Sequence, residues 1–127
     1  MAKVLFQLSL IFEKPEYFKM ANRMLSAIEE KLQQFPSAFT NWGIQLMNLV
    51  YPYHTFVITG PAARKEAKSG YDKFLPNVLL AGTKQYSDLP ICENRISSSN
   101  TQIFVCTGSS CKLPVDKFNE ALQQMNL

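Results

Sequence analysis

The sequence has few of the residues that usually carry out chemistry, with three cysteines and one histidine among its 127 residues. A secreted scaffold held together by disulfides usually carries more cysteines at this length, and in even number. We therefore expect a reducing, cytoplasmic environment. The sequence also contains no Cys-x-x-Cys motif, which is the pattern that lowers the pKa of a thiol in redox enzymes.

Long apolar runs and concentrated charge are missing as well. No apolar run approaches the ~20 residues that a membrane-spanning helix needs, and the net charge of +3 is spread along the chain. The densest basic stretch, from Arg64 to Lys68, is interrupted by Glu66 and is typical of a solvent-facing helix. A nucleic-acid site would need a basic patch interleaved with stacking aromatic residues. We expect neither nucleic acid nor a membrane among the partners.

What remains is a composition typical of one globular domain, with 46% hydrophobic and 18% charged residues. Residues 1–52 have the three- and four-residue apolar spacing of amphipathic helices. They predict three helices: one over residues 1–12, one from Pro15 to Phe35 and one from Ser37 to Val50. The short connections between them predict roughly antiparallel neighbours.

The apolar spacing changes in residues 53–127. Compact β-rich runs at 54–59, 78–82 and 103–106 predict three strands, and a helix is predicted over residues 61–70, with Gly70 as its C-cap. A last helix carries the stripe Phe118, Ala121, Leu122 and Met125. This strand–helix–strand order predicts an α/β fold: N-terminal helices packed near a small, mainly parallel three-stranded sheet that is flanked by further helices.

Cys106 and Cys111 lie at the two ends of a short turn, in the run FVCTGSSCKLPV. Such a turn can bring two β-carbons within the range of a disulfide. The alternatives are two uncrosslinked cysteines, with Cys106 buried on the strand and Cys111 packed beneath the turn, or a metal site. Metal is the weakest alternative, because Cys92 or His54 would have to complete the ligands without a recognised spacing. We expect neither a metal nor a cofactor.

His54 is the only residue that could serve a Cys–His nucleophilic pair. It is predicted at the N-terminal end of a strand, whereas open parallel sheets place their sites at the carboxyl edge. We therefore assign no catalytic residue. If the chain has a ligand pocket, we expect loops that follow the three strands to form it, because parallel strands would end at the same edge. The residues concerned are Gly60, Thr83, Thr107, Gly108, Ser109 and Ser110.

Taken together, these motifs resemble the C-terminal region of thioredoxin-domain-containing proteins, a family that includes the spermatogenesis-associated thioredoxin-like protein. The resemblance runs along nearly the whole chain. It rests on the helices MAKVLFQLSLIF and EYFKMANRML, the strand end VITG, the segment LPNVLLAG and the tail FVCTGSSCKLPV. The family's commoner tail has an Asn-aromatic-Thr-like turn where this chain has Gly108-Ser109-Ser110.

The resemblance implies the C-terminal portion of a larger architecture, in which a thioredoxin-like domain and a toroid of six helical hairpins precede this region. Because the family's presumed sites lie in those other domains, their activities do not carry over to this chain. We expect a single domain, with a helical part at 1–52 and a small α/β part at 53–127, that acts as a noncatalytic structural or interaction module. Its partners would be the missing thioredoxin-like and toroid domains, or a second copy bound through the N-terminal helices. The alternative is a small thiol-redox or ligand-binding domain that uses Cys106 and Cys111.

Overall fold

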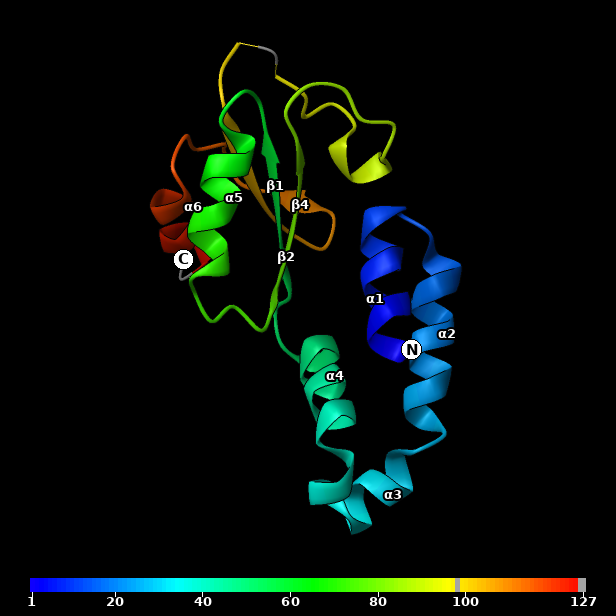
Figure 1. Ribbon diagram of the computed structural model, residues 1–127. Coiled ribbons are helices and arrows are strands. Elements are labelled where there is room, and N and C mark those ends of the chain that lie inside the picture. The colour runs from blue at the N-terminus through cyan, green and yellow to red at the C-terminus, as the bar shows by residue number, and fades with distance from the viewer. Residues whose placement is uncertain (98, 126–127) are drawn as a thin grey trace. The chain divides into compact units, whose positions relative to one another are not determined.

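The computed structural model describes residues 1–97 and 99–125, which divide into two compact units, Met1–Pro52 and Tyr53–Leu127. The first unit is helical (Figure 1). It contains α1 (Ala2–Ile11), α2 (Pro15–Ser26), α3 (Glu29–Gln34), the 3-10 helix η1 (Pro36–Phe39) and α4 (Thr40–Val50). Pro15 occupies the first turn of α2, where its missing N–H leaves no hydrogen bond unmade.

The second predicted helix is wrong in its length, because the chain breaks it between α2 and α3. The N–H of Ile28 donates to the carbonyl of Leu25 at 3.1 Å, a bond one residue tighter than in an α-helix. Ile28 itself has φ −115° and ψ 3°, outside the helical range. Apolar residues keep their helical spacing across this break, so periodicity alone could not reveal it.

The second unit combines a sheet with helices. Its elements are β1 (His54–Thr59), α5 (Ala63–Tyr71), β2 (Val78–Thr83), the 3-10 helix η2 (Pro90–Cys92), β3 (Gln102–Thr107), β4 (Ser110–Cys111) and α6 (Phe118–Met125). Gly70 lies within α5 and is not the C-cap that was predicted there.

The predicted α/β class is confirmed, but the predicted sheet of three mainly parallel strands is wrong. The sheet has four strands in the order β2-β1-β3-β4 and is mixed. β1 and β2 are parallel, whereas β3 runs antiparallel to both β1 and β4. A parallel β3 would need a crossover back to the start of the sheet. The β2–β3 connection instead returns at the edge where β2 ends, so that Gln102 pairs with Thr59.

The core of the second unit lies between the sheet and the helices α5 and α6 (Figure 1). Because side chains alternate along a strand, every second residue of β1 and β3 faces these helices. The buried cluster there is Phe56, Ile58, Ala63, Ile103, Val105, Phe118 and Ala121. All six residues of β1 are buried, and η2 contacts β1 and β2. Thr55, Val57 and Cys106 therefore belong to the face opposite α5 and α6.

A two-residue turn joins β3 to β4. Thr107 pairs with Ser110, and Gly108 has a φ of +59°, as the first central position of such a hairpin often requires. After β4 the chain continues along β3, where the N–H of Lys112 donates to Val105 and the backbones of Val115 and Ile103 exchange two hydrogen bonds. Four residues of the tail, at 110–112 and 115, are thereby held against β3.

Candidate functional site

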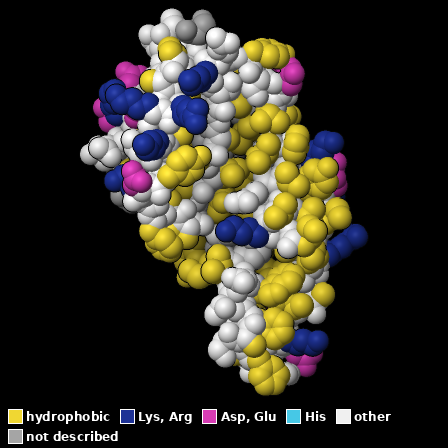
Figure 2. All heavy atoms as spheres, in the orientation of Figure 1, with side chains coloured by type: hydrophobic (Ala, Val, Ile, Leu, Met, Phe, Trp, Pro, Cys, Tyr) yellow, Lys and Arg dark blue, Asp and Glu magenta, His cyan; other side chains and the backbone are white. Residues whose placement is uncertain are grey.

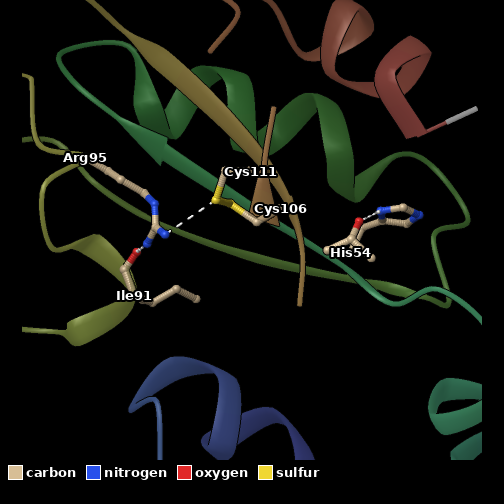
Figure 3. Close-up of a disulfide and its surroundings, with 6 residues drawn as sticks. His54, Ile91, Arg95, Cys106 and Cys111 are labelled. Atoms are coloured by element: carbon tan, nitrogen blue, oxygen red, sulfur yellow. Dashed lines mark hydrogen bonds between the residues drawn. A yellow bond between two sulfur atoms is a disulfide. The ribbon is translucent and has the colours of Figure 1, made fainter. Parts of the chain in front are cut away.

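Cys106 and Cys111 are joined by a disulfide (Figure 3). They form a directly opposed pair of the β3–β4 ladder, with Cα atoms 3.9 Å apart. Cys106 is buried, whereas Cys111 is exposed at the end of the hairpin. Of the alternatives open from the sequence, the structure contains the crosslinked one, and residues 1–97 and 99–125 hold no group of three His, Cys, Asp or Glu side chains suited to a metal.

Arg95 lies beside the sulfur atom of Cys111, the exposed member of the pair. Its Nη2 donates to Cys111 Sγ at 3.5 Å, and its Nη1 donates to the carbonyl of Ile91 at 2.5 Å (Figure 3). The backbone of Arg95 is held as well, because the buried hydroxyl of Thr59 donates to its carbonyl at 2.6 Å. Arg95 is thus held both at its backbone carbonyl and at its guanidinium, with Nη2 next to the sulfur atom of Cys111. Sequence reasoning missed Arg95, since it belongs to a polar segment that was interpreted as a surface connection.

His54 lies on the other face of the sheet from this disulfide. It is paired with Thr107 in the β1–β3 register, and its Nδ1 is 2.9 Å from Thr107 Oγ1. Burial of the ring, together with the positive charge of Lys112, lowers the pKa of His54 below 6.5. Figure 3 shows the imidazole pointing away from the sulfur atoms. His54 is therefore not placed to act as a base for Cys106 or Cys111.

The lowered pKa of His54 predicts a contribution to the pH dependence of stability. The folded protein holds the ring neutral, and the unfolded chain binds its proton more readily, so this contribution falls as the pH drops through 6.5. We expect the loss of unfolding free energy between pH 7.5 and pH 5.5, measured by urea denaturation, to be smaller in His54→Asn than in the wild type. Asparagine keeps a polar group near Thr107 but does not titrate. An equal loss in both proteins would contradict the prediction.

The six residues predicted to share a ligand pocket lie at two opposite ends of the sheet. Gly60 and Thr83 come together, with the N–H of Gly60 donating to the Thr83 carbonyl at 3.0 Å. The Thr107–Ser110 turn lies instead beside His54, at the start of β1. The predicted single cluster is wrong because β3 is antiparallel to β1, which places its carboxyl end at the amino end of its neighbour.

A cleft of about 390 Å³ lies next to Gly60, at the N-terminal ends of α5 and α6. Three of its polar side chains are engaged by the protein itself. Thr101 Oγ1 accepts from the N–H of Ala62 at 2.8 Å, and the buried Glu66 accepts from the N–H of Phe118 at 3.0 Å. Lys117 lies 3.8 Å from the same carboxylate. Glu66 thereby satisfies the first N–H of α6, and Thr101 satisfies the N–H of the residue that precedes α5. The lining residues are Pro61, Ala62, Glu66, Ser99, Asn100, Thr101, Asp116 and Lys117.

Comparison with family models, with curated proteins and with solved structures finds no match to this chain. The family resemblance thus stays a prediction. In the part of the chain that the structure describes, no helix combines the length and the apolar character needed to cross a membrane.

Proposed function

We propose that this protein acts as an interaction module, in which the helical unit has a noncatalytic role and packs against an apolar, helical partner surface. The family resemblance suggests what that surface is, namely the helical toroid of the same family, together with its thioredoxin-like domain. The low and odd cysteine count favours a cytoplasmic setting for this assembly.

The observation that carries the proposal is how few apolar side chains Met1–Pro52 buries. Its buried hydrophobic residues are Ala2, Phe6, Ala21 and Leu25. Many more of its large apolar side chains are exposed, and Figure 2 shows hydrophobic side chains gathered over the helices of this unit. Exposed apolar area of this kind marks an interaction surface. The exposed residues are Met1, Val4, Phe12, Phe18, Met20, Phe35, Ile44, Leu46, Met47, Val50 and Tyr51.

Helix α4 shows this exposure of apolar side chains most clearly, because it buries polar residues and exposes apolar ones. Its buried residues are Gln45 and Asn48, and both carry side-chain atoms without a hydrogen-bond partner among the described residues. Its exposed residues include Ile44, Met47 and Val50. These three recur every third position and therefore form one stripe along the helix. An apolar stripe of this spacing is suited to packing against another helix.

A groove between α2, α3 and α4 provides a neighbouring surface of the same character. Its volume is about 420 Å³, and leucines from the three helices supply most of its apolar lining, with Asn22 at its wall. The Asn22 Oδ1 atom is buried without a hydrogen-bond partner, and a buried unpaired acceptor is costly. A helical partner that carries apolar side chains would fill the groove.

The proposal predicts that the chain self-associates when no other partner is present, because the apolar stripe of α4 is then covered only by a second copy. We expect analytical ultracentrifugation at micromolar concentration to show oligomers for the wild type. The double variant Met47→Glu/Val50→Glu should shift the protein to monomers, since two charges on the stripe cannot be buried unpaired.

The matched control is Tyr71→Glu/Phe74→Glu, which adds the same charges at two apolar positions of the other unit that are even more exposed. This control should leave the oligomers unchanged. A monomeric wild type that binds no hydrophobic dye would overturn the proposal, and so would a control that disperses the oligomers as well as the α4 variant does.

A further inference from the structure

We infer that the Cys106–Cys111 disulfide is a thiol–disulfide exchange site, in which Cys111 is the sulfur that reacts with the substrate and Arg95 stabilises its thiolate. The substrate class is a small dithiol or disulfide, or an exposed cysteine of a partner protein. This activity is independent of the docking of the helical unit.

Solvent exposure distinguishes the two cysteines of the disulfide. Cys111 is exposed, whereas Cys106 is 5% exposed and lies on a strand within the sheet. Exchange proceeds by in-line attack of a thiolate on a disulfide sulfur, so the attacked sulfur must be reachable from solvent. An incoming thiolate therefore meets Cys111, and Cys106 is the leaving group. The third cysteine, Cys92, is completely buried and does not compete.

Arg95 supplies the charge that such a site needs. A thiolate next to an arginine is stabilised relative to the thiol, and the Nη2 of Arg95 is already 3.5 Å from Cys111 Sγ in the oxidised protein. The bonds from Nη1 to Ile91 and from Thr59 to the Arg95 carbonyl hold the guanidinium in place. The site is therefore preorganised for the anion that reduction releases at Cys111.

The reaction balances with a dithiol as the reductant. A substrate thiolate attacks Cys111, the Cys106–Cys111 bond breaks, and Cys106 leaves as a thiolate that takes up a proton. The second thiolate of the substrate then attacks the substrate sulfur that is bonded to Cys111. This attack closes the substrate disulfide and releases Cys111 as the thiolate beside Arg95. Two electrons pass to the protein, and the substrate leaves as a disulfide. In the reverse direction Cys111 attacks a substrate disulfide and Cys106 resolves the mixed disulfide.

The position of the crosslink also favours a chemical role over a purely stabilising one. The two cysteines are five residues apart, and closing a loop this short restricts the unfolded chain less than closing a long loop does in the chain-entropy model. Backbone hydrogen bonds of Lys112 and Val115 already hold the same tail to β3.

The first test uses the wild-type protein, reduced and then treated with less than one equivalent of iodoacetamide, with the label located by peptide mass spectrometry. We expect the label on Cys111, ahead of Cys106 and Cys92. Labelling of Cys106 first, or equal labelling of the two, would overturn the assignment.

Arg95→Gln should slow the alkylation of Cys111 about threefold at pH 7. Loss of the neighbouring positive charge leaves less of Cys111 as the thiolate, and the higher intrinsic nucleophilicity of that thiolate offsets part of the loss. Arg95→Lys keeps the charge and should retain most of the rate.

The second test traps the intermediate with glutathione disulfide. Cys106→Ser should accumulate a mixed disulfide on Cys111, and Cys111→Ser should form none on Cys106. The reduced wild type should instead return to its internal disulfide and release glutathione. Failure of the wild type to reoxidise in this way would refute the exchange site, whatever the oligomeric state of the α4 variants. Circular dichroism of each variant confirms that it is folded before it is scored.

Discussion

Replacement of Phe118 by alanine is expected to lower the free energy of unfolding by about 3–5 kcal/mol, the usual cost of removing a buried aromatic ring. Phe118 is 1% exposed and belongs to the cluster between the sheet and the helices of the second unit. Its ring packs against Phe56 with a centroid distance of 5.5 Å. Because α6 begins at Phe118, the cavity would open where this helix meets the sheet. Urea denaturation monitored by circular dichroism measures the loss.

Phe74→Ala is the matched control for this substitution. It removes the same ring from the same unit at a position that is 92% exposed, so we expect a change of less than about 0.5 kcal/mol. A similar loss in both variants would show that the described packing of Phe118 does not determine stability.

A second large loss, of about 3 kcal/mol, is expected for Gly60→Ala. Gly60 has a φ of +106°, which side chains of L-residues rarely adopt, and strain of this kind costs about 1–3 kcal/mol. A Cβ atom there would also lie 2.3 Å from the carbonyl oxygen of Asn100. The backbone at Gly60 or at Asn100 must shift to make room, and this shift would disturb the hydrogen bond from the Gly60 N–H to the Thr83 carbonyl. Thermal or urea unfolding measures the effect.

Gly108→Ala separates the effect of the backbone angle from that of the collision. Gly108 also has a positive φ, of +59°, but no atom lies within 4 Å of a Cβ built there. We expect a cost of about 1 kcal/mol from the left-handed conformation alone. If Gly108→Ala destabilised the protein as much as Gly60→Ala, the close approach of Asn100 would have no energetic weight.

The elements that could be predicted from the sequence are those that local patterns determine. Strand β1 was predicted with its observed bounds, because a run of β-formers ends at Gly60-Pro61. The direction of β3 depends on the edge at which the preceding connection returns, which no periodicity records. Gly70 shows the same limit within a helix. It was predicted as a C-cap, yet a Cβ at this position would lie 2.6 Å from the ring of Phe118, so its role is close packing.

For the candidate site, the sequence indicated the cysteine pair but not its surroundings. The pair is visible because both residues flank one turn. Arg95 reaches Cys111 only because Thr59, 36 residues earlier, binds its carbonyl and folds the connecting segment toward the sheet. A contact of that kind follows from the tertiary fold alone, and an arginine in a polar segment carries no local signal of it. The separation of His54 from the sulfur atoms likewise depends on the strand register.

The tail that follows β3 has one further consequence. From Ser110 to Val115 it is fastened to that strand by one covalent bond and by backbone hydrogen bonds on either side of it. If the covalent bond opens, the hydrogen bonds still keep Val115 beside Ile103 and so keep the chain directed toward α6. The scaffold that positions Arg95 and the two sulfur atoms is therefore expected to stay assembled when the disulfide is reduced, as repeated rounds of the proposed exchange would require.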